Sequence, residues 1–366
     1  MLSEKPSIEN KKYLSETIGV LRFPLMVCVV LIHTIIPNQT QHLFVDWFDS
    51  YVIESFVRIA VPLFFFISGF LFFNGVDRFG RSEYWDKLKK RVKRLLVPYI
   101  LCGVFAIFVK YVFFLLGEDD SVYLFDNYYK WIYYVLWDPI NYQLWFVRDL
   151  FLVVLISPLI YFLLKRLKFV FVLLLGGAWL LWHKNIFALF DLEYIIITGN
   201  IFGVLGFDFV SLFFFSFGAW FALFNKNFAS EFKRLFPGTI VLYLGCTIGK
   251  FVCNDGYFAE IFNRLAIVFG LISAVAIVYM FVKRGKVKRS MFLEQGSQFI
   301  YYYHVLFLIC YFKVLFHLHL FEVESTFVYF GVYISCPIIT ILLGLWLYKI
   351  GMRYMPRVMN FVLGLK

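Results

Sequence analysis

The chain alternates between long apolar runs and short connections rich in charged residues. Crossing a hydrocarbon core of about 30 Å takes roughly 20 apolar residues, and ten runs approach or reach that length. The predicted spans are Ile18–Ile36, Phe56–Gly75, Leu95–Gly117, Tyr142–Leu164, Phe169–Trp182, Asp208–Phe224, Leu235–Cys253, Asn263–Val282, Gln298–Phe321 and Thr326–Ile350. The fifth run is short for a span and is also compatible with a re-entrant segment. The pattern predicts an all-α polytopic membrane helix bundle of about ten transmembrane helices.

The charged connections predict how the bundle is oriented. Lys and Arg fill the N-terminal tail, the connections after the second, fourth, sixth and eighth spans, and the C-terminal tail, whereas acidic residues fill the other connections. The positive-inside rule places the basic connections in the cytoplasm, so both termini are expected there. If the fifth run did not cross the membrane, every later connection would lie on the opposite side, and the basic connections would no longer all be cytoplasmic. The charge pattern therefore favours a fifth span. We expect residues 1–366 to form a single membrane domain.

The composition supports the same class of protein. Of the 366 residues, 62% are apolar, 22% aromatic and only 16% charged, which excludes an ordinary soluble domain and a disordered chain. The net charge of +11 lies in the connections, so the expected partners are membrane lipids and not nucleic acid. The six cysteines stand singly inside apolar runs, so the sequence predicts neither a metal site nor a disulfide framework.

Two ionisable side chains in the first span are functional candidates, because burying such groups in a membrane is costly. Arg22 and His33 are eleven residues apart, and eleven steps of about 100° return to the same helix face after a rise of roughly 16 Å. The alternative is that Arg22 snorkels to the headgroups and His33 caps the other end of the helix. The sequence leaves both interpretations open.

Two pairs of ionisable residues and one single histidine have both structural and functional interpretations. Arg91 and Arg94 precede the third span, where they fit either the positive-inside pattern or a site for phosphate oxygens. Arg148 and Asp149 are adjacent in the fourth span, so they either neutralise one another or pair with other helices. His304 lies among tyrosines in the ninth span, where it is either a hydrogen-bonded structural residue or a catalytic one.

Four segments, in this order, resemble the acyltransferase 3 family of multi-pass membrane O-acyltransferases over most of the chain. They are Arg22 and His33 with ten residues between them, the run Val61–Phe73 with its Ser68-Gly69 pair, Arg91-x-x-Arg94 ahead of Pro98-Tyr99, and the stretch from Leu144 through Trp145, Arg148 and Asp149 to Ile160, followed later by the segment around His304. The third resembles the basic motif that the family has at its cytoplasmic face. The fourth is similar to the branch whose members acylate sugars.

The chain departs from the family pattern in two places. Many members have a Trp-Ser-Leu segment ending in Glu, and here Trp145 is followed by Phe, Val, Arg and Asp149. Large members also carry a C-terminal extramembrane hydrolase-like domain, and here a short basic tail follows the last span. We therefore expect a stand-alone form of the enzyme.

The resemblance implies transfer of an acyl group, most often acetyl, from acyl-CoA to a hydroxyl of a cell-envelope glycan or a lipid-linked sugar. Acyl-CoA would be a donor substrate, and no permanently bound cofactor is expected. The usual setting of similar proteins is the bacterial cytoplasmic membrane.

The residues fit that chemistry in the following roles. Arg91, Arg94 and Arg22 would bind the phosphates of the donor, and His33 would act as general base, since its unperturbed pKa of about 6.5 suits proton removal near neutral pH. Arg22 and Asp149 are further catalytic candidates. Other candidate site residues are Arg148, Trp145, His304 and Ser68.

Two other functions use the same residues. In a transporter or flippase of an envelope glycan, the charges would line a translocation path and no thioester would be consumed. In a structural scaffold of a biosynthetic complex, the buried charges would be mutual salt bridges.

Overall fold

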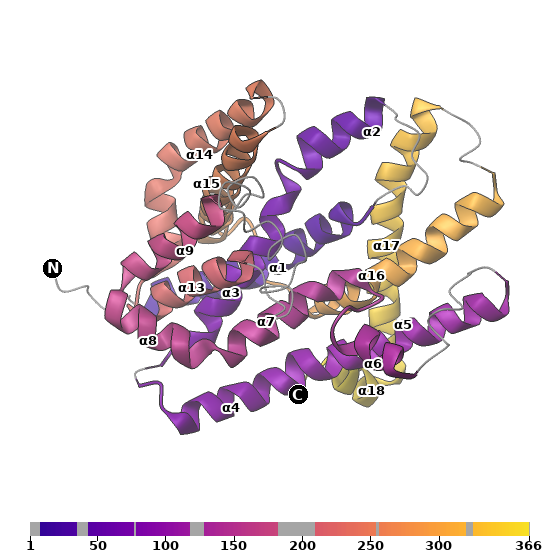
Figure 1. The fold of residues 1–366 in the computed structure, drawn as a ribbon, viewed down its shortest axis with the longest axis horizontal. Helices are drawn as coiled ribbons and strands as arrows, with labels where there is room; N and C mark the ends of the chain where they lie inside the picture. Colours follow the sequence, from indigo (N-terminus) through magenta and orange to yellow (C-terminus); the bar gives the residue numbers. More distant parts are fainter. Residues whose placement is uncertain are drawn as a thin grey trace, which may run out of the picture.

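A computed structural model describes residues 8–34, 43–76, 78–117, 128–181, 209–253, 256–319 and 325–365, which form helices and their connections (Figure 1). The α-helices are α1 (Ile8–Ile32), α2 (Leu43–Phe48), α3 (Ala60–Phe73), α4 (Arg81–Arg91), α5 (Val97–Leu115), α6 (Tyr128–Leu136), α7 (Trp145–Leu155), α8 (Ser157–Leu167), α9 (Phe169–Leu181), α13 (Phe209–Leu223), α14 (Phe228–Val252), α15 (Tyr257–Lys283), α16 (Met291–His317), α17 (Thr326–Tyr354) and α18 (Pro356–Val362). Shorter turns are the π-helices η1 (Asp49–Ile53) and η3 (Val92–Leu96) and the 3₁₀ helices η2 (Val57–Ile59) and η5 (Tyr142–Leu144).

The helices have the lengths and composition of an integral membrane protein. Within the described residues, six helices are long and apolar enough to cross a membrane, or up to eight if each of two bent helix pairs counts as one span. Two shorter apolar helices, α9 and α13, correspond to the predicted fifth and sixth spans. The count of ten spans stays a prediction, and the predicted boundaries at Ile36, Trp182, Asp208 and Phe321 lie outside the described residues.

Several helices extend beyond the apolar runs that predicted them. The third predicted span begins at Leu95, whereas α4, η3 and α5 form one helical stretch of 35 residues from Arg81 to Leu115. Its π-turn at Val92–Leu96 lies just before Pro98, which has no N–H to offer the carbonyl one turn earlier. At the start of α16, the Ser290 side chain accepts a hydrogen bond from the backbone of Leu293, so this helix begins seven residues before the predicted span.

The fourth predicted span is bent by 63° between α7 and α8. Pro158 lies in the first turn of α8, and its missing N–H interrupts the hydrogen-bond ladder at this point. Tyr142–Leu167 is therefore a broken span or a re-entrant loop.

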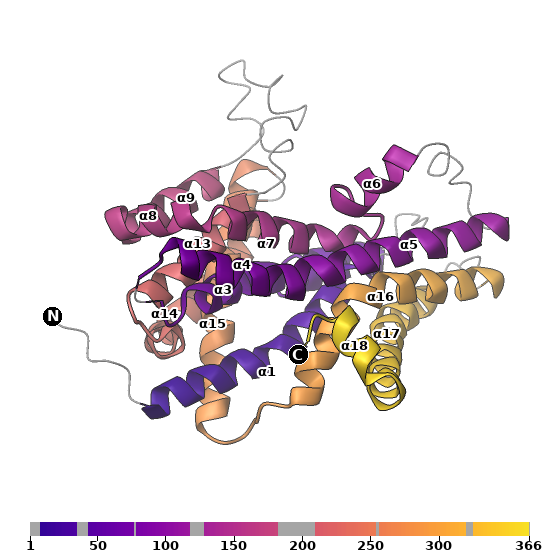
Figure 2. The same ribbon diagram turned by 90° about the horizontal axis from the view of Figure 1, so that it is seen from below.

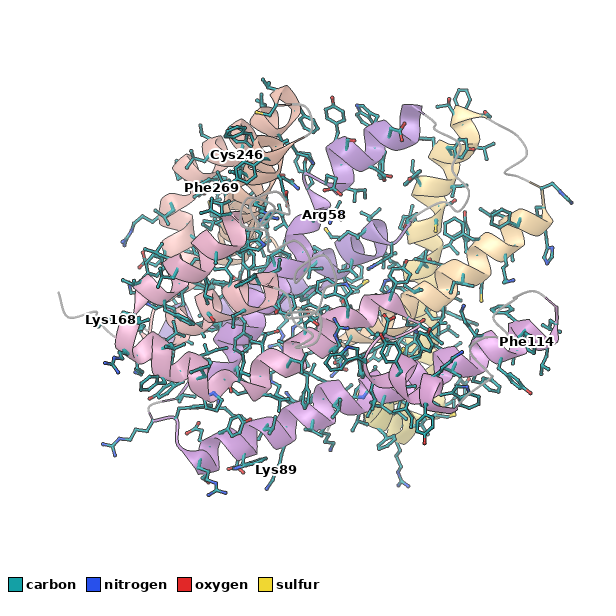
Figure 3. The ribbon with its side chains drawn as sticks, in the orientation of Figure 1. Arg58, Lys89, Phe114, Lys168, Cys246 and Phe269 are labelled. Atoms are coloured by element: carbon teal, nitrogen blue, oxygen red, sulfur yellow. The ribbon has the colours of Figure 1, made fainter. Side chains whose placement is uncertain are left out.

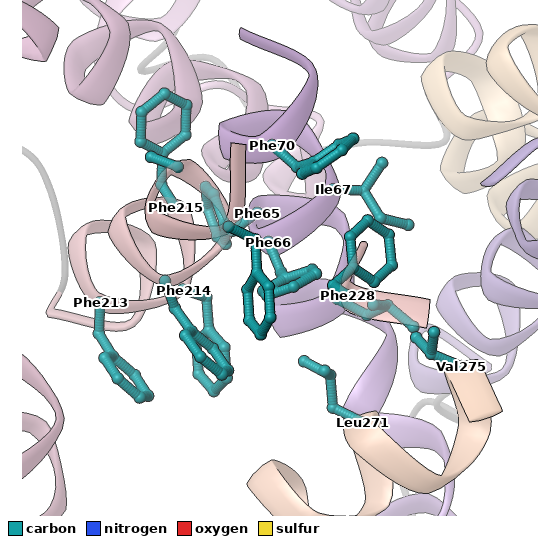
Figure 4. Packing of buried hydrophobic residues seen from close by; sticks show 14 of the residues in the cluster. Phe65, Phe66, Ile67, Phe70, Phe213, Phe214, Phe215, Phe228, Leu271 and Val275 are labelled. Carbon is teal, nitrogen blue, oxygen red and sulfur yellow. The ribbon is translucent and has the colours of Figure 1, made fainter. Parts of the chain in front are cut away.

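The core is built from phenylalanines of α3, α13 and α14 with aliphatic residues of α15 (Figure 4). Helices α3 and α13 approach at backbone distance, because a Cβ on Gly218 would lie 1.9 Å from the carbonyl oxygen of Phe66 and a Cβ on Gly69 would lie 2.0 Å from that of Phe215. Small residues at such crossings permit close helix packing in membranes. The Ser68-Gly69 pair therefore has a packing role through Gly69, with Ser68 half-buried beside it.

The basic residues of several connections gather at one end of the molecule. Figure 2 shows α1 and the long α4–α5 helix running from the side where the N-terminus lies. Lys11, Lys226 and Arg289 line a common pocket there, and we call this the basic end. Figure 3 places Lys168 at the left edge of the molecule and Phe114 at the opposite edge.

Candidate functional site

Helices α1 and α16 pack together and each contributes two ionisable side chains to their interface. Arg22 of α1 forms a salt bridge with Glu294 of α16. Further along the same two helices, Nε2 of His304 lies 3.2 Å from Nδ1 of His33. Eleven residues separate the two α1 positions and ten separate the two α16 positions, so both contacts recur after about 15–16 Å of helix rise. Helix α16 therefore supplies a partner for each candidate that the sequence identified on α1.

The histidine pair is enclosed by aromatic and backbone groups. His304 is fully buried, whereas His33 is partly exposed at the C-terminal end of α1. The rings of His33 and His304 lie 5.1 Å apart between centroids, and the Tyr142 ring lies at the same distance from His33. The Tyr301 ring is 6.2 Å from His304. The structure thus brings His304 to the predicted general base.

Glu294 joins two arginines at the other end of the interface. Its Oε2 accepts a hydrogen bond of 2.5 Å from Nε of Arg289, while its Oε1 pairs with Arg22. The Arg289 side chain crosses α1 at Gly19, where a Cβ would lie 2.5 Å from its Cδ. Because glycine leaves that space open, the arginine can reach the buried carboxylate.

A pocket of about 610 Å³ lies over this charged cluster at the basic end. It is lined by Arg22, Arg289, Glu294, Lys11, Lys226 and the amides of Asn74, Asn225 and Asn227, together with apolar residues. Four basic side chains oppose one acidic side chain in its wall. The pocket therefore suits an anionic ligand with oxygen acceptors.

Arg91 and Arg94 are not among the residues that line this pocket. The Arg91 guanidinium stands 5.8 Å from the ring centroid of Phe72, and Arg94 is exposed on η3. The charge of Arg94 acts electrostatically on both Arg91 and Arg22. The predicted basic motif thus contributes to the field at the basic end without forming the pocket wall.

Arg148 and Asp149 pair with each other. Arg148 binds the Asp149 carboxylate at 2.9 Å through a terminal nitrogen and donates a 2.6 Å hydrogen bond to the carbonyl of Trp137. Asp149 is almost fully buried. Among the described residues its carboxylate is bonded to Arg148 and not to His33 or His304. Among the described residues, the direct partner of the Asp149 carboxylate is therefore Arg148.

The remaining candidates, Trp145 and Ser68, lie among the packed helices of the main core. The Trp145 ring is partly buried against the main core, with its centroid 6.3 Å from that of Phe65, and Ser68 lies in the α3 segment that crosses α13. Within the described part of the chain, no group of three potential metal ligands is assembled.

The sequence analysis missed Glu294, Arg289 and Tyr142. Glu294 and Arg289 fall outside the apolar runs, in stretches interpreted as connection. One signal for Glu294 was available, since its distance of ten residues from His304 nearly matches the spacing of Arg22 and His33.

Comparisons with known proteins identify the family of this chain. The chain is 30% identical over 167 residues to the succinoglycan biosynthesis protein ExoH of Rhizobium meliloti (strain 1021), a match that covers 42% of this chain and 44% of that protein. The chain thus aligns with less than half of the length of this relative. No solved structure matches. The family profile described as an acyltransferase domain matches residues 16–362, nearly the whole chain, and the protein therefore belongs to the acyltransferase 3 family, as the sequence predicted.

Proposed function

We propose that this protein is a membrane O-acyltransferase that moves an acyl group, acetyl in the first instance, from acyl-CoA to a hydroxyl of a cell-envelope glycan or a lipid-linked sugar. The observation that carries the proposal is the α1–α16 interface, which has a basic pocket at one end and a histidine pair about 16 Å of helix rise away. Family membership supports acyl transfer. The name of the relative, a succinoglycan biosynthesis protein, supports a glycan acceptor.

The proposed topology has ten crossings with both termini in the cytoplasm of a bacterium, so the basic end faces the cytoplasm. The alternation of basic and acidic connections supports it. Acyl-CoA is made and kept in the cytoplasm, and its phosphates would meet the four basic side chains of the pocket first. Arg91 and Arg94 add to the positive potential that attracts them.

The chemistry assigned to His33 is general base catalysis. Its imidazole takes the proton of the acceptor hydroxyl while the hydroxyl oxygen forms a bond to the thioester carbonyl carbon. The carbon–sulfur bond then breaks, and the leaving sulfur takes the proton back from His33. The products are the O-acylated acceptor and free CoA thiol, so atoms and charge balance without a metal or a redox cofactor.

The test is release of free thiol from acetyl-CoA by the purified protein in lipid nanodiscs, with and without an extract of envelope glycan. We expect acceptor-dependent thiol release by the wild type and its loss in His33→Ala. His317→Ala is the matched control, because it removes an exposed imidazole from the far end of α16. It should retain wild-type release.

Each outcome has a defined meaning. Full activity of His33→Ala would show that His33 is not the base. If the wild type neither released thiol with the extract nor bound acetyl-CoA, the transferase proposal would fail, and transport of the glycan would be the next function to assay. Acceptor-dependent thiol release by the wild type, in which the salt bridges are intact, would exclude the hypothesis that the protein is only a structural scaffold.

Donor binding tests the pocket separately. Arg289→Gln should weaken CoA binding by about tenfold, since one charge-assisted contact to phosphate is worth roughly 1.5 kcal/mol. Arg91→Gln and Arg94→Gln should weaken it less and in a salt-dependent manner, because they act at longer range. Arg234→Gln, on the exposed surface of α14, is the control. Calorimetry in nanodiscs would measure the dissociation constants, and an effect on acceptor affinity alone would contradict the assignment.

A further inference from the structure

His304 makes hydrogen bonds that determine which of its ring nitrogens carries a proton. Its Nδ1 lies 3.1 Å from the carbonyl oxygen of Ile300 and 2.9 Å from that of Tyr301. A carbonyl oxygen can only accept, so Nδ1 of His304 must be the donor. In the neutral ring the lone pair is then on Nε2, the atom that faces His33.

His33 also has hydrogen-bond partners that determine which ring nitrogen carries the proton. Helix α1 ends at Ile32, and the backbone N–H of His33 bonds to the carbonyl of Val30. The carbonyl oxygen of Val29 instead lies 2.8 Å from Nδ1 of the His33 ring. Both neighbours of this nitrogen, the Val29 oxygen and Nε2 of His304, are therefore acceptors, so Nδ1 of His33 carries the hydrogen.

The opposite proton arrangement conflicts with the geometry. If Nε2 of His304 carried a hydrogen, Nδ1 of His33 would accept it and present a lone pair to the Val29 oxygen at 2.8 Å. Two lone pairs at that distance repel one another. The arrangement with hydrogen on both Nδ1 atoms satisfies all four contacts of the pair, which are those of His304 with Ile300, Tyr301 and His33 and that of His33 with Val29.

We infer that His304 is a positioning residue, which acts through His33 by holding its ring in the tautomer with a free lone pair on Nε2. This inference rests on the proposed function, in which His33 is the base. In the described structure, every recorded hydrogen bond of the His33 ring is made by Nδ1, which leaves Nε2 to take the proton of the acceptor hydroxyl. The imidazolium formed in that step keeps its Nδ1–H on two neutral acceptors, which stabilise it.

The consequence for the acceptor is a defined direction of approach. The titratable side chains recorded against the His33 ring are His304 of α16 and Tyr142 of η5. The hydroxyl must reach the edge of the ring opposite to Nδ1, which is the side away from Val29 and His304. The Nδ1 proton stays in place throughout the transfer, so no proton relay through His304 is required.

The test compares two variants of His304 whose side chains are large. One can still accept the hydrogen bond from Nδ1 of His33, and the other cannot. His304→Gln keeps an acceptor oxygen that can reach Nδ1 of His33, whereas His304→Phe keeps a ring and removes the acceptor. We expect His304→Phe to lower kcat by about 10- to 100-fold, by analogy with removal of the partner that orients a metal-ligating histidine, with KM for acetyl-CoA unchanged. The acid limb of its kcat–pH profile should move to lower pH, because the imidazolium of His33 loses one acceptor. His304→Gln should recover most of the rate and of the profile.

A measurement without turnover keeps this inference separate from the proposed function. Nitrogen-15 spectra of histidine-labelled protein report which ring nitrogen carries hydrogen, and His33→Ala identifies the signal among the six histidines. We expect the Nδ1–H tautomer for His33 in the wild type and a mixture in His304→Phe. An Nε2–H tautomer in the wild type would overturn the inference even in an inactive preparation. The inference would also be wrong if His304→Phe and His304→Gln lost the same activity and kept the wild-type acid limb. The loss would then result from altered packing and not from the missing hydrogen bond. Full activity of His33→Ala would instead refute the proposed function of His33 as general base.

Discussion

Replacing Glu294 by Gln should destabilise the protein while strengthening its binding of CoA. Glu294 is the carboxylate shared by Arg22 and Arg289, and its side chain is 5% exposed. Removing one member of a buried ion pair costs about 3–5 kcal/mol when the remaining charge cannot be hydrated. Here the two arginine side chains are 38% and 36% exposed, so water can reach them. We therefore expect a smaller loss of about 1–3 kcal/mol.

The effect on ligand binding has the opposite sign. In the wild type, an anionic donor must compete with Glu294 for the guanidinium groups of Arg22 and Arg289. The neutral amide of Glu294→Gln frees both cations, so CoA should bind more tightly and with a steeper salt dependence.

Thermal unfolding in nanodiscs and calorimetric titration with CoA measure the two effects. Glu231→Gln is the matched control, because Glu231 pairs with Arg234 on the exposed surface of α14, and an exposed pair contributes at most about 1 kcal/mol. A double-mutant cycle of Arg22→Gln and Glu294→Gln should give a coupling energy of about 0.5–3 kcal/mol. Equal melting temperatures for Glu294→Gln and Glu231→Gln, or unchanged CoA affinity, would refute the reasoning.

Three other substitutions test separate parts of the structure. Gly218→Ala should lower stability by about 1–3 kcal/mol or more, because its Cβ would overlap a backbone carbonyl of α3. Gly177→Ala is the control and should not change the melting temperature, because nothing lies within 4 Å of the added Cβ. Asp149→Asn should destabilise the protein by about 1–3 kcal/mol, because it removes the salt bridge with Arg148. Adding Arg148→Gln should recover part of that stability. A loss of kcat without a change in melting temperature would instead favour a catalytic Asp149. Tyr142→Leu should lower kcat by about 2- to 13-fold, since an aromatic pair is worth about 0.5–1.5 kcal/mol, and Tyr142→Phe should keep the wild-type rate.

The apolar pattern predicts which segments are helical much better than where each helix ends. Helix α15 begins at Tyr257 and α16 at Met291, six and seven residues before the predicted spans. Hydropathy marks the part of a helix that lies in lipid, while the hydrogen-bond ladder continues into polar surroundings until a cap or a turn ends it. The bend before Pro158 was readable from the residue type, because proline interrupts that ladder wherever it stands inside a helix.

The candidate site was predictable only in the part that lies within one helix. Helical periodicity places Arg22 and His33 on the same face, and the structure confirms that both face α16. Their partners belong to a segment some 270 residues later in the chain. Which helix packs against α1 depends on tertiary contacts that a single sequence does not encode in its local periodicity. For the same reason, the sequence could not show that Arg91 and Arg94 are absent from the wall of the pocket that Arg22 lines.

The two α1–α16 contacts differ in charge, and the difference follows from where each one lies. At the basic end, Arg22 and Glu294 adjoin a polar pocket that water can enter, so an ion pair is tolerated and the charges can exchange partners with a phosphate. At the other contact, His304 is fully buried, and a permanent charge there would lack both water and a counter-ion among the described residues. A pair of neutral imidazoles meets both constraints, because it satisfies the buried polar atoms at rest and acquires a charge only while a proton is in transit. An arginine or a carboxylate in place of His304 would carry its charge at all times, which is why we expect His304→Arg and His304→Glu to impair folding as well as turnover, unlike His304→Gln.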